Sequence, residues 1–268
     1  MEFILKLHNM YYHVFNELSD PRSTNWLPVS SPLFCVAVIV IYVKFATNWG
    51  PRFMQSLEPF QLKRIIIVYN ISQIILNLLL AYKIILCIRM YGYNLLCEPA
   101  KFENTPEALQ EVSITRSYHL LKAYDLLDTV FHVLRKKDSH ISFVHVYHHI
   151  GMYFATWVSV KFLPGGHFAS MAFINVGVHT IMYTYFLITS ITSDHKKYAW
   201  WKKYVTQLQM AQFLFNTIQL GLPLVSSKCE YPRWPLLLMV PQNMLMFLLF
   251  ADFYNTAYIR PKKVSKSL

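Results

Sequence analysis

The stretch Ser142-Phe143-Val144-His145-Val146-Tyr147-His148-His149-Ile150 is the strongest single signal in the chain. It places three histidines inside a run of apolar residues long enough to enter a membrane. At helical spacing the three imidazoles fall within an arc of roughly 100°. Titratable rings in an apolar segment lose hydration and need partners there, so the stretch predicts a functional site. A lone core histidine would not carry that prediction.

The composition of the whole chain predicts an integral membrane protein. Its 268 residues are 54% hydrophobic and 15% charged, and the mean hydropathy is +0.30, which is too apolar for an ordinary soluble domain. The net charge is +11. Because the basic residues stand at the ends of apolar segments, they favour a membrane surface or a phosphorylated substrate, and no nucleic-acid partner is expected. Residues 1–20 lack an uninterrupted apolar core, so no cleavable leader is expected.

Seven apolar segments, each near the ~20 residues that a spanning helix needs, predict an all-α, polytopic membrane protein in a single domain, 1–268. The third segment is the least apolar, because it contains Lys122, Asp125 and Asp128. The expected helices lie at about 33–48, 65–88, 117–134, 141–163, 168–190, 204–225 and 235–259. The longest connection, 89–116, is acidic, and we expect it to be partly helical.

The distribution of Lys and Arg predicts the orientation in the membrane. Fourteen of them fall on one side, in 49–64, 135–138, 191–203 and 260–268, against seven on the other. This bias puts the N-terminus on the lumenal side and the tail 260–268 in the cytosol. Cys97 and Cys229 then lie in lumenal connections. Two cysteines in an oxidising compartment can form a disulfide, and two free thiols are the alternative.

Polar residues recur at helical spacing in five of the expected helices. In the third, Lys122, Asp125 and Asp128 share one face with Thr129 and His132. Isolated polar residues in membrane helices often only bond a neighbouring helix, and that interpretation stays open for the Gln and Asn stripe. Buried ionisable groups are costly, so their convergence predicts a site. The members on the fifth and sixth helices are Asn175, His179, Met182, Tyr183, Gln209, Gln212, Asn216 and Gln219.

The expected orientation also gives the depth of this cluster. The fourth helix begins near Asp138, so His145 to His149 lie roughly 8–14 Å inside the cytosolic end. Two basic runs would line the mouth, Arg135-Lys136-Lys137 and Lys196 to Lys203, the second of which includes Lys202. Such a site suits an amphiphile that has an anionic, phosphate-bearing head and an apolar tail.

These motifs resemble the signatures of the ELO-type elongases of very-long-chain fatty acids. The resemblance covers about residues 18–260, with the motifs in the expected order and spacing. It depends on Lys122-x-x-Asp125-x-x-Asp128-Thr129, Val133-Leu134-Arg135-Lys136-Lys137, His145-x-x-His148-His149, Asn175-x-x-Val178-His179-x-x-Met182-Tyr183-x-Tyr185 and Thr206-x-x-Gln209-x-x-Gln212-Phe213. Shorter matches are Asp20-Pro21-Arg22, Ser31-Pro32, Gly50-Pro51 and Tyr69-Asn70.

Four positions depart from the family pattern. Asp125 stands where a Glu is usual, His132 replaces an aromatic residue, Leu121 replaces the usual Ser, and Phe186 replaces a Tyr. The histidines, Lys122 and Asp128 are intact, so we expect activity with an altered polar network on the third helix. The C-terminal lysines resemble a dilysine retrieval signal poorly, so residence in the endoplasmic reticulum membrane rests on the family resemblance.

The resemblance implies condensation of a long-chain acyl-CoA with malonyl-CoA to give 3-oxoacyl-CoA, CoA and CO₂. It implies neither a metal nor a cofactor besides these substrates. Expected partners are membrane lipid and the other enzymes of the elongation cycle: 3-oxoacyl-CoA reductase, 3-hydroxyacyl-CoA dehydratase and enoyl-CoA reductase. A homo-oligomer is left open. The CoA-binding candidates are Arg135, Lys136, Lys137, Lys202 and Lys203.

The residue types suggest a role for each histidine. Because no cysteine lies near the histidine motif, imidazole is the available nucleophile, and we expect His148 to take the acyl group. His179 would polarise the malonyl thioester, and His145 and His149 would orient the rings. Asp128 would fix a histidine tautomer. The remaining supporting residues are Lys122, Asp125, Asn175, Tyr183, Gln209 and Gln212.

The acyl tail would occupy a buried tunnel that runs from the histidines toward the lumenal helix ends, where Phe173 is the candidate wall residue. Plain helix packing is the alternative role of Phe173. A membrane di-iron desaturase or hydroxylase is the main rival enzyme, but two irons need roughly eight ligands in several motifs and this chain has one. A seven-helix receptor or transporter is the rival from another class.

Overall fold

The computed structural model describes residues 1–192 and 198–260, and within them every regular element is a helix. This confirms the predicted all-α class. Lys196 and Lys197 of the expected basic run, and the tail from 261 to 268 with Lys262 and Lys263, lie outside the described residues. The longer helices are α1 (Glu2–Tyr12), α4 (Pro32–Lys44), α6 (Lys63–Tyr91), α7 (Pro106–Asp125), α8 (Leu127–Leu134), α9 (Phe143–Phe162), α10 (Phe168–Ile191), α11 (Ala199–Val225) and α12 (Arg233–Tyr254).

Short helical pieces complete these elements. They are η1 (His13–Glu17), α2 (Pro21–Thr24), α3 (Leu27–Ser30), η2 (Phe45–Trp49), α5 (Gly50–Met54), η3 (Asp138–His140) and η5 (Asn255–Ile259). Side-chain caps and prolines set several boundaries. Ser142 accepts a hydrogen bond from the amide of His145 and so begins α9. Thr105 caps α7, with Pro106 in its first turn.

Within residues 1–192 and 198–260, four helical segments are long and apolar enough to cross a membrane, judged by length and composition. They are Pro32–Met54, Lys63–Tyr91, Phe168–Ile191 and Arg233–Ile259. They correspond to the expected segments 33–48, 65–88, 168–190 and 235–259. The count of seven spans stays a prediction, because the other three expected segments carry more polar residues.

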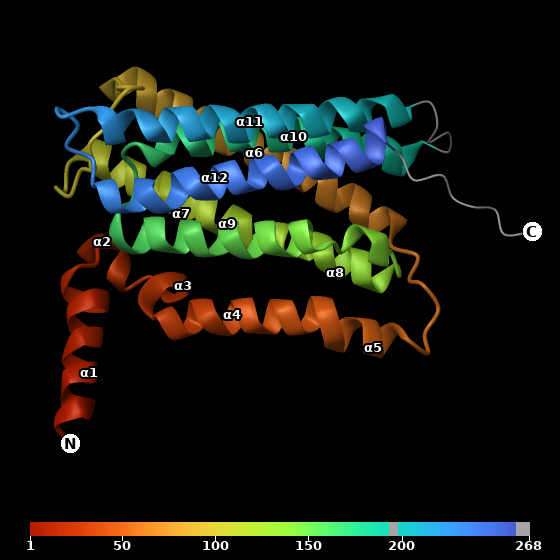
Figure 1. The fold of residues 1–268 in the computed structure, drawn as a ribbon, viewed down its shortest axis with the longest axis horizontal. Helices are drawn as coiled ribbons and strands as arrows, with labels where there is room; N and C mark the ends of the chain where they lie inside the picture. The colour runs from red at the N-terminus through yellow and green to blue at the C-terminus, as the bar shows by residue number, and fades with distance from the viewer. Residues whose placement is uncertain (193–197, 261–268) are drawn as a thin grey trace, which may run out of the picture.

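The long helices run side by side along one axis, and α1 crosses that direction at one end (Figure 1). The most extensive packing is of α10 on α6, of α11 on α12 and of α7 on α9. Three apolar clusters join them. One links α6, α7 and α10 through Ile84, Tyr118 and Val176, and another links α4 to α9 through Cys35 and Trp157. The third joins α10, α11 and α12.

The third expected helix is divided. α7 ends at Asp125 and α8 begins at Leu127, so the polar face predicted for 117–134 bends at Leu126. The expected helical content of the 89–116 connection is also present, because α7 already begins at Pro106. The helix α1 was not among the expected elements.

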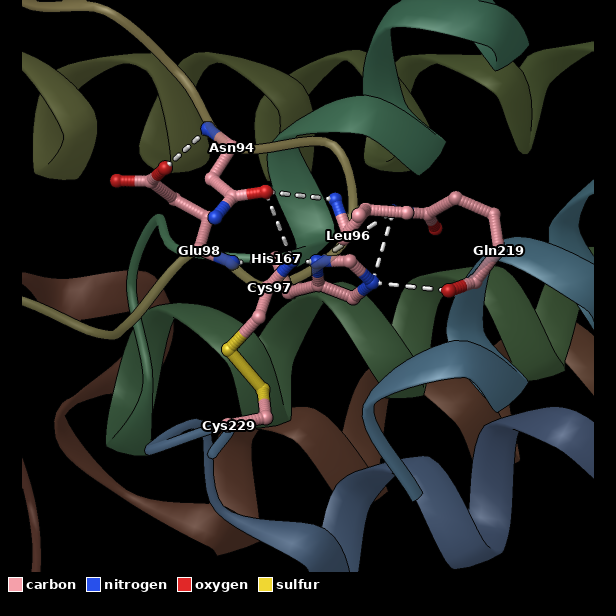
Figure 2. The surroundings of a disulfide bond; sticks show 7 residues. All are labelled: Asn94, Leu96, Cys97, Glu98, His167, Gln219 and Cys229. Carbon is pink, nitrogen blue, oxygen red and sulfur yellow. Dashed lines mark hydrogen bonds between the residues drawn. A yellow bond between two sulfur atoms is a disulfide. The ribbon is translucent and has the colours of Figure 1, made fainter. Parts of the chain in front are cut away.

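The two ends of the bundle differ. The histidine end contains η3 and the start of α9, and the disulfide end contains the bond between Cys97 and Cys229, whose Cα atoms are 5.6 Å apart. Figure 2 shows that His167, at the start of α10, lies beside this bond. The His167 ring contacts Gln219 of α11, with 2.8 Å between His167 Nε2 and Gln219 Nε2. The disulfide joins the α6–α7 connection, which contains Cys97, to the α11–α12 turn, which contains Cys229.

Candidate active site

The largest described cavity, about 450 Å³, opens at the histidine end between α8, α9, α10 and α11. Its volume lies within the range of small-molecule sites. Six histidines line it, together with the carboxylate of Asp128 and the amides of Asn175, Gln209 and Gln212. The histidines are His132, His140, His145, His148, His149 and His179. The structure thus brings together all four predicted catalytic histidines around one cavity.

The three histidines of α9 lie on the face that the sequence predicts. The ring centroids of His145 and His149 are 4.3 Å apart, and those of His148 and His149 are 5.8 Å apart. His148 also contacts the ring of Phe213 on α11, at 6.1 Å between centroids. His179 of α10 forms the opposite wall and is buried.

His145 is oriented by hydrogen bonds that helical spacing alone does not predict. Its Nε2 lies 2.8 Å from Thr129 Oγ1, and Thr129 Oγ1 lies 2.7 Å from the hydroxyl of Tyr42. This chain links α9 to α8 and α4. Thr129 stood in the predicted polar face, but nothing in the sequence pairs it with a residue 87 positions away in α4.

Behind the histidines lies a buried charged network. The ammonium of Lys122 donates to Asp125 Oδ2 at 2.8 Å, and both side chains are almost fully buried. Asp125 Oδ1 also accepts from Gln73 Nε2 of α6 at 2.9 Å. The Nδ1 atom of His179 lies 3.7 Å from Asp125 Oδ2, too far for a hydrogen bond and close enough for electrostatic interaction. A buried pair of this kind persists only when its remaining hydrogen bonds are satisfied.

Asp128 has a different partner from the expected one. Its Oδ2 accepts a hydrogen bond from the Tyr183 hydroxyl at 2.8 Å, whereas Asp125 Oδ2 lies 3.7 Å from Nδ1 of His179. The two carboxylates stand on either side of the helix break at Leu126, Asp125 at the end of α7 and Asp128 in the first turn of α8. In this structure Asp128 is hydrogen-bonded to Tyr183, and its expected role of fixing a histidine tautomer stays a prediction.

Several polar atoms of the cavity wall have no hydrogen-bond partner within the described part of the chain. These buried atoms are Asn175 Oδ1, His179 Nδ1 and Gln212 Oε1. Gln209 Nε2 has only a weak contact, with Met182 Sδ at 3.4 Å. Buried polar atoms without partners are unusual in folded proteins, so these atoms are suited to bind a polar ligand.

The basic residues predicted for CoA are not equivalent. Lys202 lines the cavity mouth, whereas Lys203 lies over the Tyr254 ring, at 5.9 Å from its centroid, and Lys136 approaches the Gln55 carbonyl at 3.5 Å. His140 lies at the mouth, and its pKa is lowered first by burial and then by the positive charges of Lys202, Lys137 and Arg135. The mouth is therefore cationic.

Two smaller cavities continue the row toward the disulfide end. The first, about 30 Å³, shares His148, Asn175, Gln212 and Phe213 with the large cavity. The second, about 40 Å³, is mostly apolar and shares Tyr118, Ala155 and Met171 with the first.

The predicted wall residue Phe173 lies elsewhere. It packs against the cluster of α6, α7 and α10, so helix packing, the alternative interpretation, describes its surroundings. None of the described cavities is lined by it.

A group of three possible metal ligands lies at the disulfide end, away from the histidines. Glu98, Glu107 and Glu111 present carboxylate oxygens within 4.8 Å of one another. The ammonium of Lys101 already binds all three, at 2.7, 2.6 and 3.3 Å. Lys101 thus supplies the positive charge that such a cluster needs.

Comparison with known proteins gives one consistent family. Residues 27–266 match the ELO family, described as the GNS1/SUR4 family. A very long chain fatty acid elongase of Aedes aegypti is 37% identical over 265 residues, which are 98% of this chain and 74% of the relative. Elongase 7 of Rattus norvegicus is 34% identical, covering 96% and 92%. Elongase 1 of Mus musculus is 33% identical, covering 100% and 95%.

Proposed function

Because the chain belongs to the ELO family, we propose that it is an enzyme of very long chain fatty acid elongation and that it catalyses the condensing step. A long-chain acyl-CoA, malonyl-CoA and one proton would give 3-oxoacyl-CoA, CoA and CO₂. The observation that carries the proposal is the single cavity that combines the four predicted catalytic histidines with partnerless amides and a cationic mouth. The protein would be a multi-pass enzyme of the endoplasmic reticulum membrane with seven spans.

The cationic mouth would bind the CoA moiety. The phosphates of CoA carry several negative charges. Lys202 lines the mouth, and the positive charges of Lys202, Lys137 and Arg135 all lower the pKa of His140 there. Lys136 and Lys203 contribute less, because their ammonium groups lie against other parts of the chain. Both substrates would then enter with the thioester pointing toward α9.

His148 would act as the nucleophile. A neutral ring nitrogen attacks the thioester carbonyl of acyl-CoA, the N–C bond forms, the C–S bond breaks, and the CoA thiolate leaves and takes up a proton. None of the residues that line the described cavity is a cysteine, so no thiolate competes. The place of His148 in both the large cavity and the next one suits a group that meets the head and the tail of the substrate.

The second half-reaction would use the opposite wall. Malonyl-CoA loses CO₂, and the resulting enolate attacks the acyl carbon, so that the C–C bond forms and the N–C bond to His148 breaks. His179 would hold the developing enolate oxygen, together with the amides of Asn175 and Gln212. The Lys122–Asp125 pair lies behind His179 and would fix the charge distribution around its ring.

The acyl tail would occupy the row of three cavities as one tunnel. The two smaller cavities are narrow, so Tyr118 and Met171, which separate them, would have to move aside for a long tail. Burial of each CH₂ stabilises the complex by about 0.8 kcal/mol, which would offset this displacement. The product, a 3-oxoacyl-CoA, would then need the reductase and dehydratase activities of the elongation cycle.

Release of CoA before malonyl-CoA is added tests the two-step route. Purified protein is mixed with a long-chain acyl-CoA alone, and free CoA is measured in the first turnover. A burst close to one CoA per active site is expected, together with an acyl group bound covalently to His148 in peptide mapping. A reaction that releases CoA only when malonyl-CoA is present would replace the acyl-imidazole with a single-step attack.

A further inference from the structure

A separate pocket lies toward the disulfide end, between the short helix α2 and residues 109–120 of α7. Its volume is about 280 Å³, and its lining includes Arg22, Trp26, Ser113, Arg116, Ser117 and Leu120. It shares no lining residue with the row of cavities that starts at the histidines. The pocket is therefore not explained by the proposed condensation.

Arg116 has unused hydrogen-bonding capacity in this pocket. Its Nη2 donates to the backbone carbonyl of Arg22, and its guanidinium carbon lies 5.6 Å from the centroid of the Trp26 ring. Its Nε is buried and has no partner among the described residues. A guanidinium carries five N–H donors, so Arg116 can still bind an anion through two of them.

The second arginine of the pocket is used differently. Arg22 donates to both oxygens of Asp20, to the Lys101 carbonyl at 2.7 Å and to the Glu103 carbonyl at 2.8 Å. These bonds hold α2 against the α6–α7 connection. Arg22 therefore shapes the pocket, and Arg116 is the group that is left to recognise a ligand.

The position of α1 indicates the level of the membrane surface. Figure 1 shows α1 at the disulfide end, running across the direction of the long helices, as a helix in the plane of a membrane would. Phe3, Leu7 and Met10 fall on one side of it at helical spacing and are all exposed. Such a helix typically lies at the boundary between headgroups and acyl chains. The chain passes from α1 through η1 and residues 18–20 into α2, which borders the pocket.

The residues of α7 show the same order from polar to apolar. Ser113, Arg116 and Ser117 line the pocket, and Arg116 contacts Arg22 of α2; Leu120, one turn further along α7, is 51% exposed. Trp26 fits this level as well, because tryptophan is enriched at membrane interfaces. A polar cup followed by an exposed apolar side chain matches a phosphate headgroup followed by its acyl tail.

We propose that this pocket binds the phosphate of a phospholipid from the leaflet on the disulfide side. The Arg116 guanidinium would donate to two phosphate oxygens, with the Ser113 hydroxyl as a further donor, and one acyl chain would lie along Leu120. The bound lipid would hold the start of α7 against α2. The proposal does not depend on the reaction at the histidines.

The experiment measures lipid retention by the full-length protein in detergent. Native mass spectrometry is recorded during titration with phosphatidylglycerol, with phosphatidylcholine and with inorganic phosphate, for the parent chain and three variants. Arg116→Gln removes the guanidinium. Ser113→Trp fills the pocket and keeps Arg116. Arg89→Gln is the matched control, because Arg89 lies in the last turn of α6 and is exposed outside the pocket.

Phosphatidylglycerol is expected to bind the parent chain and Arg89→Gln equally, and to bind Arg116→Gln and Ser113→Trp about tenfold more weakly, the loss typical of one charge-assisted contact. Ser113→Trp keeps the result decisive if Arg116→Gln folds poorly. Equal lipid binding by the parent chain and Ser113→Trp would overturn the proposal. Binding of inorganic phosphate without retention of lipid would also overturn it, because the site would then hold a free anion.

Discussion

The two ends of the helical bundle treat their polar groups in opposite ways. At the disulfide end the cluster around Lys101 is satisfied within the chain, and Arg116 is the exception there: Lys101 binds three carboxylates, Glu111 accepts from the amide of Gly166 at 2.9 Å, and, of these charged groups, only the buried Nε of Arg116 lacks a partner in the described part of the chain. At the histidine end, buried polar atoms of Asn175, His179 and Gln212 lack partners within the described residues.

This difference distinguishes the residues that stabilise the fold from those that are available for the reaction. Groups with complete hydrogen bonding fix the backbone, because moving them would leave a buried donor or acceptor without a partner. Groups without partners contribute little to the fold and remain available to a substrate. We therefore expect substitutions at the histidine end to change turnover with little loss of stability, and substitutions at the disulfide end to do the reverse.

The largest expected effect is that of His148→Ala. Removing the proposed nucleophile should lower kcat by on the order of 10³-fold or more, because the group acts only in the reaction. Thermal unfolding should stay close to that of the parent chain, since the ring is only partly buried. Turnover with acyl-CoA and labelled malonyl-CoA is the measurement.

His13→Ala is the matched control, because His13 is exposed and pairs with Glu17 far from the cavity. Near-normal turnover by a folded His148→Ala protein would remove His148 from the mechanism and break the contrast between the two ends.

The next effect concerns the disulfide. Cys229→Ser should lower the free energy of unfolding by about 2–5 kcal/mol, because the bond closes a long loop in the unfolded chain. The sequence separation of the two cysteines is 132. The turnover of each folded molecule should be retained, since neither cysteine lines the histidine cavity.

Peptide mapping without reduction should find Cys97 linked to Cys229 in the parent protein. The double variant Cys97→Ser/Cys229→Ser should lose the same free energy as the single one. An unchanged unfolding temperature in both would show that the connection is held by its other contacts.

Lys101→Met should have a smaller, pH-dependent effect. Burial holds the pKa of Glu111 above its usual value, and the charge of Lys101 opposes that rise. Its removal should cost about 1–3 kcal/mol at pH 7.5, because buried carboxylates lose their counter-charge.

The sign of the pH dependence follows from that pKa. With Glu111 shifted upward in the folded state, folding takes up a proton, so the loss of stability in Lys101→Met should become smaller as the pH falls to 5. Thermal unfolding at both pH values, with the exposed Lys6→Met as control, checks this. If the stability loss of Lys101→Met grew as the pH fell, Glu111 would not be the charge that this variant leaves without a partner.

The smallest expected effect is a shift in the chain length of the product. Met171→Ala should open the boundary between the two smaller cavities and favour products longer by about one two-carbon unit, worth about 1.6 kcal/mol of buried CH₂. Chromatography of the products is the measurement. Phe173→Ala is the matched control and should leave the distribution unchanged, because Phe173 packs against α6 and α7. If Phe173→Ala lengthened the products and Met171→Ala did not, Phe173 would be the residue that limits chain length.

Much of the candidate site could be read from periodicity. Helical spacing placed His145, His148 and His149 on one face, and Asn175 and His179 on another, and the structure brings both faces to one cavity. His140 was missed because it lies in a short turn without any repeat. The helix α1 was also missed, although Phe3, Leu7 and Met10 recur at helical spacing.

The sequence by itself determined the all-helical class, the apolar segments and the family, because these depend on local composition and on spacing along the chain. Only the tertiary structure decided which carboxylate meets which partner. Asp125 binds Lys122 and Gln73, and Asp128 binds Tyr183, because a helix break at Leu126 and the packing of α6 and α10 set those distances. Periodicity gives the face of a helix, but the neighbour of that face depends on the packing of helices far apart in the chain.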